Sequence, residues 1–557
     1  MHTLPENLWL YDTTLRDGAQ MQGVRFSAKD KLTVVQMLDD FGVHYIEAGW
    51  PGANPVDDEV YAALKNNPLK QAKLVAFGAT CKPGSQASSD KQLAALLESE
   101  APVITLVAKT SAFHIESILR TTREENLRMI ADSVAFLKQH EREVWIDAEH
   151  FFDGYADDPQ LTLDCLRAAV NTGADGVVLC DTNGGTLPNQ VATLVQRVVK
   201  EFGIPVGIHA HNDCELAVAN ALSAYESGAA MIQGTMNGYG ERCGNTNLIS
   251  LIPTLQLKYK ANLFAPEQLG RLTELSRSMA ARANRTPDPF APYVGQAAFA
   301  HKGGLHASAM SKSTASYEHI DPTLIGNDRH ILVSNQAGRS NLLQKASAFG
   351  YDIQKPEEAL AYVKQKEQHG FQFEEGDASL ELLLRRRDPE HKAAFQVEEL
   401  SVHSMTRDGG EGLHRASVKV NVNQQSLWSA AEGRGPVEAI DRALKSALGS
   451  FWPELEQCHL TDYKVRILDP DAATAATTHV WVEASYNGAV WNTIGCSPSI
   501  IEASQQALSD TLEYFILKRH ELTCSSLMTT DRSSPATRDS QLALSNTQGD
   551  NNGHQAA

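Results

Sequence analysis

The segment HAHNDCELAVANAL, residues 209–222, is the most informative part of the chain. His209 and His211 lie two positions apart in PVGIHAHND, which is typical of a strand, and such residues point to the same side. Both imidazoles can therefore reach one cation, although one core and one surface histidine would explain the pair equally well. A helical repeat of apolar residues follows, as at the catalytic end of a β/α barrel.

Seven further apolar stretches resemble this strand, and amphipathic helical segments alternate with them. Near-continuous apolar runs indicate parallel strands that are buried on both faces. The series spans about 270 residues, which fits a (β/α)8 TIM barrel of class α/β. The alternative is a doubly wound open sheet, which would gather polar strand ends at one switch point instead of around the whole series. The eight stretches are residues 8–12, 45–50, 73–78, 103–109, 144–151, 176–182, 205–213 and 231–240.

The composition excludes several classes of protein. The chain has 557 residues, too many for one core, and is 42% hydrophobic and 21% charged. Its net charge of −19 argues against nucleic-acid and anionic-membrane partners. No apolar run approaches a membrane span, and the first residues lack the features of a signal peptide. The eight cysteines form no CxxC pair, so we expect reduced thiols in a cytoplasmic protein.

Polar side chains recur where the expected strands end, and in a closed barrel these ends meet at one mouth. One carboxylate, two histidines and an amide oxygen suit a divalent cation such as Mn²⁺, Mg²⁺ or Zn²⁺. The lack of thiolate ligands argues for an open, catalytic site. The residues at these ends are Arg16, Asp17, Glu149, His150, Asp181, Thr182, His209, His211, Asn212, Asp213, Glu241, Arg242 and Asn245.

Three motifs carry a resemblance to a known family. They are YDTTLRDGAQ at residues 11–20, HAHND at 209–213 and GYGERCGNTNL at 238–248. In this order and spacing they resemble the metal-dependent acyl-CoA condensing barrels. That family contains the 2-isopropylmalate, homocitrate and citramalate synthases, and it is related to hydroxymethylglutaryl-CoA lyase and the pyruvate carboxyltransferases. The resemblance extends over nearly the whole chain.

The resemblance implies roles for the residues at the barrel mouth. Arg16 would steer the keto oxygen of the substrate, and Thr182 would hold the substrate carboxylate. Glu149 would be an acid near the reacting carbon. The divalent metal would have four ligands: Asp17, His209, His211 and Asn245.

Residues 298–327 are rich in glycine and histidine, which is unusual for a linker, although a solvated interdomain loop would also explain them. The resemblance implies that His306 and Tyr317 reach into the active site of the partner subunit in a homodimer. Ser308 stands where relatives often carry an acid that would orient the histidine. HKGGLH and YEHIDP most resemble the citramalate subgroup, which takes pyruvate.

The expected domains follow from changes of pattern along the chain. Residues 1–280 would form the catalytic barrel and residues 281–394 helical linker subdomains. Alternating strands with two helices predict an α/β domain over residues 395–524, which resembles the regulatory and dimerisation domain of the family. Gly433, Gly435 and Pro436 precede a helix, where free amides could hold the carboxylate of a branched-chain amino-acid effector, although a plain loop would serve equally well. Residues 525–557 have a disordered composition.

The resemblance therefore implies an acyltransferase that condenses acetyl-CoA with pyruvate and water to give (R)-citramalate and CoA, in isoleucine biosynthesis. The alternatives are a 2-isopropylmalate synthase that takes 2-ketoisovalerate, a lyase or carboxyltransferase on the same barrel, and a non-catalytic amino-acid sensor. The long C-terminal region argues against a simple lyase, and no biotinyl-lysine motif supports a carboxyltransferase. The intact Arg16, Asp17, His209 and His211 argue against a sensor.

Overall fold

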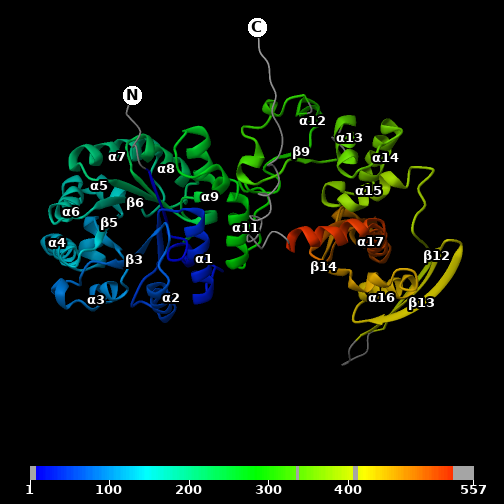
Figure 1. The fold of residues 1–557 in the computed structure, drawn as a ribbon, viewed down its shortest axis with the longest axis horizontal. Helices are drawn as coiled ribbons and strands as arrows, with labels where there is room; N and C mark the ends of the chain where they lie inside the picture. The colour runs from blue at the N-terminus through cyan, green and yellow to red at the C-terminus, as the bar shows by residue number, and fades with distance from the viewer. Residues whose placement is uncertain (1–7, 311, 334–337, 406–411, 531–557) are drawn as a thin grey trace, which may run out of the picture. The chain divides into compact units, whose positions relative to one another are not determined.

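The computed structural model describes residues 8–310, 312–333, 338–405 and 412–530 (Figure 1). The contacts divide the chain into two units, and each is described by itself. The first unit comprises Met1–Ala300 and Glu318–His330, and the second comprises His301–Tyr317 and Ile331–Ala557.

Eight parallel strands of the first unit close into a barrel in chain order, and β1 pairs with both β2 and β8. The predicted barrel is therefore confirmed, and the alternative of an open sheet is wrong. The strands are β1 (Trp9–Asp12), β2 (Tyr45–Gly49), β3 (Lys73–Ala79), β4 (Val103–Lys109), β5 (Glu143–Glu149), β6 (Gly176–Asp181), β7 (Val206–Ala210) and β8 (Met231–Gly234).

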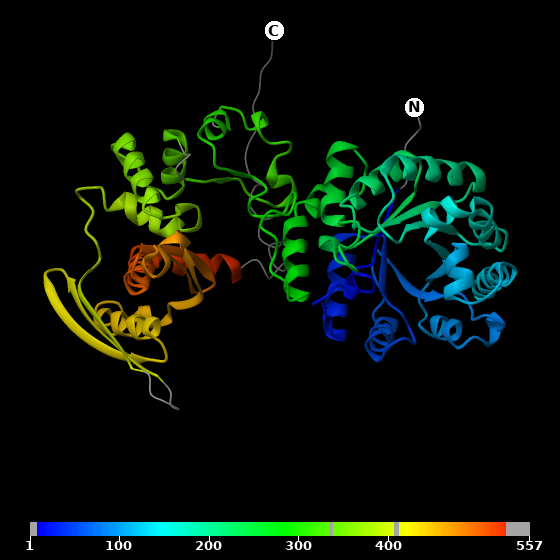
Figure 2. The ribbon, with the colours of Figure 1, turned by 180° about the vertical axis from the view of Figure 1, so that it is seen from behind.

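Helices surround the barrel, and Figure 2 shows this ring from behind. Local signals fix their ends: Ser27 and Asp30 form a capping box before α1, and Gly42 ends α1 in the left-handed region at φ 96°. The helices are α1 (Ala28–Phe41), α2 (Pro55–Asn66), α3 (Lys91–Glu98), α4 (Arg123–Gln139), α5 (Phe151–Asp157), α6 (Pro159–Asn171), α7 (Pro188–Phe202) and α8 (Ala217–Glu226), followed by α9 (Leu248–Pro253), α10 (Pro266–Leu269) and α11 (Leu272–Arg282).

The interior of the barrel is a packed core and not a channel. Trp145 is almost fully buried and stands edge-on to Trp9 and Tyr45, with ring centroids 6.2 and 6.3 Å apart. A Cβ atom at Gly176 would lie 2.2 Å from the Trp145 ring, so this position requires glycine. The polar residues of the mouth therefore lie above a layer of packed aromatic side chains.

The second unit begins with helices and ends with two small sheets. The helices are α12 (Gly304–Met310), α13 (Arg339–Ala348), α14 (Pro356–Gln368) and α15 (Asp377–Arg385). The short strands β9 (Ala300–His301) and β10 (His330–Ile331) form a two-stranded sheet. These helices match the helical linker expected before the C-terminal domain.

The C-terminal domain repeats one pattern: three antiparallel strands and a helix. The first copy contains β11 (Gln396–Met405), β12 (Leu413–Val422), β13 (Gln425–Gly433) and α16 (Pro436–Leu448); the second contains β14 (His459–Ile467), β15 (Thr478–Tyr486), β16 (Ala489–Ser497) and α17 (Ile500–Thr530). Asn487 and Gly488 join β15 to β16 with φ values of 49° and 83°, as a two-residue hairpin requires. The α/β domain expected from the alternating pattern is confirmed.

The structure also bears on the expected C-terminal tail, on the cysteines and on the search for membrane-spanning helices. The predicted tail starts at residue 525, but α17 continues to Thr530, and residues 531–557 lie outside the described residues. The seven cysteines for which the structure gives a state are free thiols. Within the described ranges, no helix combines the length and apolarity needed to cross a membrane.

Candidate active site

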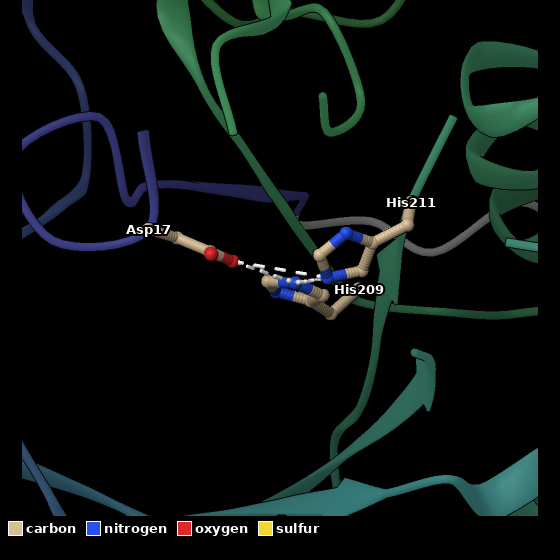
Figure 3. Close-up of side chains that lie close together, drawn as sticks. All are labelled: Asp17, His209 and His211. Atoms are coloured by element: carbon tan, nitrogen blue, oxygen red, sulfur yellow. Dashed lines mark hydrogen bonds and ion pairs between the residues drawn. The ribbon is translucent and has the colours of Figure 1, made fainter. Parts of the chain in front are cut away.

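Asp17, His209 and His211 converge at the mouth of the barrel, from the loop after β1 and the end of β7. His209 Nε2 lies 3.1 Å from Asp17 Oδ2 and 3.3 Å from His211 Nε2, and His211 Nε2 lies 4.0 Å from Asp17 Oδ2. Figure 3 shows the three side chains pointing toward one another. All three are buried, and one potential ligand atom of each lies within 4.8 Å of the others. The expected juxtaposition is therefore present.

Asn245 lies beside this triad, since its backbone forms an isolated antiparallel bridge with His211. Its amide nitrogen donates to Asp17 Oδ2 across 2.8 Å and lies 3.1 Å from His209 Nε2. The amide oxygen is buried without a hydrogen-bond partner. A Cβ atom at Gly240 would lie 1.8 Å from that oxygen, so the motif glycine makes room for the amide.

The donor set fits a divalent cation. His211 faces the triad with its Nε2 atom, and Asn245 Oδ1 is buried without a hydrogen-bond partner, which is costly unless another group satisfies it. Burial, together with nearby His209, lowers the pKa of His211 to about 4, so its imidazole is neutral near pH 7. Burial alone would raise the pKa of Asp17, but the positive charge of Arg16 and the neighbouring His209 outweigh it and hold that pKa well below its usual range. Two imidazoles and a carboxylate suit Mn²⁺, Mg²⁺ or Zn²⁺.

Arg16 lies next to the triad with its guanidinium 3.7 Å from Asp17 and stacked 3.8 Å from the centroid of the Phe77 ring. Its Nε donates to Glu47 Oε1 across 2.6 Å. Burial opposes the charge, but Glu47 and Asp17 raise the pKa of Arg16 above its usual value. The mouth therefore holds a permanent cation beside the carboxylate of the triad, suited to a substrate oxygen that gains negative charge.

Thr182 follows β6, and its hydroxyl oxygen accepts a hydrogen bond of 2.9 Å from the backbone N–H of His150. The hydroxyl hydrogen is thus left to donate to a substrate. Arg242 braces this loop: it donates to the Thr182 carbonyl across 2.8 Å and forms two hydrogen bonds with Asp213, of 2.7 and 2.8 Å. The GERCGN and HND motifs thereby hold the position of Thr182.

Glu149 ends β5 and forms an ion pair with Lys109 at the end of β4. Arg16, Asp17, Glu149, Thr182, His209 and His211 line one cavity of about 560 Å³. This volume is in the range of small-molecule sites. The structure therefore brings together the catalytic and substrate-binding residues expected within the barrel, and their individual roles stay predictions.

Three buried polar residues at the mouth are not among those predicted from the sequence: Glu47 on β2, Asp147 on β5 and Gln233 on β8. Each is a polar residue within a largely apolar strand, and a buried polar residue of this kind is the signal that could have revealed them. Glu47 orients Arg16, as described above. Gln233 lies 2.7 Å from His209 Nδ1 and donates to Asp147 Oδ1 across 2.9 Å.

His306 and Tyr317 belong to the second unit and not to the barrel unit. Their rings stack with centroids 4.0 Å apart and an interplanar angle of 23°, so the structure brings the two together. Both side chains are exposed, and 49% of Tyr317 is accessible. The side chain of Ser308 lies outside what the structure describes. A role in the site of a partner subunit stays a prediction.

The predicted carboxylate site lies where β13 ends at Gly433 and α16 begins at Pro436, with Gly435 as its N-cap. Glu438 already binds a backbone amide just before this helix: its carboxylate accepts a hydrogen bond of 2.7 Å from Arg434 N and forms an ion pair with Arg442. An effector carboxylate would therefore meet a resident negative charge, and this site stays a prediction.

Family models cover most of the chain. The HMGL-like model matches residues 7–276, the homocitrate synthase post-HMGL domain-like model matches residues 293–370, and the LeuA allosteric (dimerisation) domain model matches residues 374–516.

Full-length relatives decide the family. The chain is 47% identical to an (R)-citramalate synthase of Synechocystis over 92% of this chain and 97% of that protein. It is 46% identical to an (R)-citramalate synthase of Aquifex aeolicus over 93% of this chain and 99% of that protein. The chain belongs to the family of (R)-citramalate synthases. A probable 2-isopropylmalate synthase of Methanopyrus kandleri is more distant, at 31% identity over 90% of this chain and 97% of that protein. Membership in the (R)-citramalate synthase family agrees with the barrel, the helical linker and the C-terminal α/β domain.

Proposed function

We propose that this chain condenses acetyl-CoA with pyruvate and water to give (R)-citramalate and CoA. The observation that carries the proposal is the Asp17–His209–His211 triad beside Arg16, in a chain 47% identical to an (R)-citramalate synthase over 92% of its length. A divalent cation bound by the triad and Asn245 would supply Lewis acidity to the keto oxygen of the acceptor. Mn²⁺, Mg²⁺ and Zn²⁺ all suit these donors.

The residues of the mouth would bind and orient the keto acid. The Arg16 guanidinium donates to the keto oxygen and stabilises the negative charge that develops there when carbon attacks. The Thr182 hydroxyl donates to the substrate carboxylate, while the His150 N–H fixes the hydroxyl oxygen at 2.9 Å. Both contacts hold the acceptor carbon in one orientation, which lowers the entropic part of the barrier.

Carbon–carbon bond formation needs a base, because the acetyl methyl group must lose a proton before its carbon can attack. Glu149 on β5, or the stacked His306–Tyr317 pair, would accept that proton. Return of the proton to the oxyanion formed at the keto oxygen would free the base to activate the water that cleaves the thioester. Glu149 is held by Lys109, so its carboxylate is fixed near the cavity. Release of CoA by water then makes the overall reaction irreversible.

The second unit would complete and regulate the enzyme. We infer that the chain is a homodimer in which His306 and Tyr317 act at the partner's barrel, since both rings are exposed and stacked on each other. The match of residues 374–516 to an allosteric (dimerisation) domain supports this arrangement. A branched-chain amino acid, isoleucine for a cytoplasmic enzyme of isoleucine biosynthesis, would bind in that domain near Gly433, Gly435 and Pro436.

The test is release of CoA thiol from acetyl-CoA with a panel of α-keto acids. The proposal expects release with pyruvate, dependence on a divalent cation, and (R)-citramalate as the product. A preference for 2-ketoisovalerate would instead make the chain a 2-isopropylmalate synthase. No condensation with any keto acid, but binding of an amino acid, would favour the sensor.

A further inference from the structure

His209 is held on both sides of its ring. Its Nε2 atom faces the triad, whereas its Nδ1 atom lies 2.7 Å from Gln233 Oε1 on β8. Gln233 Nε2 in turn donates to Asp147 Oδ1 on β5 across 2.9 Å. The three side chains are 5%, 1% and 3% exposed, so water does not compete for these bonds. They form a hydrogen-bond chain across the barrel, from Asp147 through Gln233 to His209.

The Gln233 amide determines which atoms donate and which accept along this hydrogen-bond chain. A glutamine side chain has one accepting oxygen and one donating NH2 group. The Asp147 carboxyl oxygen takes the NH2 group, so the amide oxygen is left for His209. That oxygen can only accept, and therefore His209 Nδ1 must carry a hydrogen. A neutral imidazole protonated at Nδ1 has its lone pair at Nε2, the atom that faces Asp17.

Asp17 competes for the same proton. Its Oδ2 atom lies 3.1 Å from His209 Nε2 and would accept a hydrogen bond from a proton placed there. The Asn245 amide nitrogen, 3.1 Å from Nε2, opposes a proton there, whereas Asp17 favours one. Without an acceptor at Nδ1, the proton of a neutral His209 is drawn toward Nε2 and Asp17. The lone pair needed by a cation would then be lost. The buried Gln233 amide on β8 therefore favours the tautomer whose Nε2 lone pair is free to bind a cation.

We propose that Gln233 and Asp147 are positioning residues that hold His209 as its Nδ1–H tautomer and so present Nε2 to the cation. The inference rests on the proposed metal site and deepens it. Hydrogen-bond partners of this kind usually change metal affinity by about 10–100-fold when they are removed.

The experiment makes the same glutamine-to-methionine substitution at two positions and compares the two variants as metal-free proteins. Gln233→Met removes the acceptor and keeps the length of the side chain. Gln256→Met is the matched control, because Gln256 also uses both amide atoms, in bonds of 2.7 and 3.2 Å with the Phe264 backbone, but does not line the cavity. The readouts are the dissociation constant for Mn²⁺ alone and the ¹⁵N shifts of the His209 ring, recorded at a pH above which these shifts no longer change.

The proposal expects Gln233→Met to weaken Mn²⁺ binding by about 10–100-fold and to move the His209 proton to Nε2, with Gln256→Met like the wild type. Unchanged Mn²⁺ affinity and an unchanged Nδ1–H tautomer in Gln233→Met would overturn it. The double variant Gln233→Glu with Asp147→Asn keeps an acceptor for His209 and a donor behind it. This variant should recover both readouts, and failure to recover them in a folded protein would also contradict the proposal.

Two further variants test the hydrogen-bond chain and the metal site separately. If Gln233→Met does not fold, Asp147→Leu tests the same chain, because a free amide at Gln233 can rotate and should give a mixture of His209 tautomers. A single Nδ1–H tautomer in that variant would count against the role of Asp147. His209→Ala reports on the metal site itself: full Mn²⁺ affinity there would refute the proposed site, whereas loss there with no effect of Gln233→Met would refute the positioning role alone.

Discussion

Arg16 Nε donates to Glu47 Oε1 across 2.6 Å, and the Glu47 side chain is completely buried. The other carboxylate oxygen of Glu47 accepts a hydrogen bond of 2.5 Å from the Tyr11 hydroxyl. Both carboxylate oxygens of Glu47 are therefore hydrogen-bonded. The Arg16 guanidinium is bound by Glu47 on one side and stacks on the Phe77 ring on the other. Its remaining N–H groups are available to a ligand of the cavity.

Glu47→Gln should lower kcat/KM for the keto acid by about 10–100-fold, because a hydrogen bond between charged groups is worth roughly 1.5–3 kcal/mol. Steady-state kinetics at saturating acetyl-CoA would measure the effect. Glu143→Gln is a matched control on β5, where Glu143 bonds Tyr45, Lys73 and Trp145 away from the cavity. Equal losses in the two variants would mean that Glu47 serves only the stability of the barrel.

The sequence could predict the barrel and the two histidines of the triad because both depend on short-range patterns, whereas Asp17 is assigned to the metal by the resemblance of its motif to the family. Apolar strands alternate with amphipathic helices, and the spacing of His209 and His211 places both on one side of a strand. Glu47, Asp147 and Gln233 could not be assigned in this way. Their roles depend on which strands face each other across a closed barrel, and a pairing such as that of Gln233 with Asp147 is not a local property.

The C-terminal domain shows the same limit. Alternation predicted its strands, and the hairpin at Asn487 and Gly488 follows a local rule. The carboxylate site expected before α16 rested on the helix end alone. Glu438, in the first turn of the helix, turns back to cap Arg434 N, and a side chain's direction cannot be read from a glycine pattern.

Removal of the metal should silence the enzyme reversibly. A chelator should abolish CoA release, and Mn²⁺ or Mg²⁺ should restore it, because Asp17, His209 and His211 supply donors for one cation. His211→Ala should remove both metal binding and condensation while the thermal midpoint of unfolding stays close to that of the wild type. Full activity of the wild type in metal-free buffer would contradict the assignment of the triad.

Asp12 should make the stability of the barrel depend on pH. Burial raises the pKa of Asp12 to about 7, although hydrogen bonds from Thr14 oppose the shift. The folded state therefore keeps a proton that the unfolded state releases above about pH 4. The stability that this proton contributes is present below that pH and is lost as the pH rises through about 7.

Asp12→Asn removes this titration. The free energy of unfolding of the variant relative to the wild type should therefore rise between about pH 4 and pH 8, by up to about 4 kcal/mol. Thermal or denaturant unfolding across this pH range would measure the difference. A difference that stays constant with pH would show that the carboxyl group titrates normally in the folded protein.

Mixed dimers test where His306 acts. His209→Ala removes a residue of the barrel site, and His306→Ala removes a residue of the second unit. If each His306 serves the partner's barrel, a dimer of one subunit of each kind contains one site with both residues intact. Co-expression with two affinity tags should therefore yield mixed dimers with up to about half of the wild-type activity per dimer, although each pure variant is inactive. Inactive mixed dimers would place His306 at the barrel of its own subunit, and an active His306→Ala homodimer would place it outside the site.

The most direct measurement is the ratio of kcat/KM for pyruvate to kcat/KM for 2-ketoisovalerate, with acetyl-CoA and Mn²⁺ present and (R)-citramalate identified as the product. A cavity that fits the methyl group of pyruvate can exclude the larger branched side chain of 2-ketoisovalerate by size. A pocket built for the branched side chain would discriminate against pyruvate by only about 10–200-fold in kcat/KM for each missing methylene. We predict a ratio well above one. A ratio below one, or no release of CoA with pyruvate, would contradict the proposed activity.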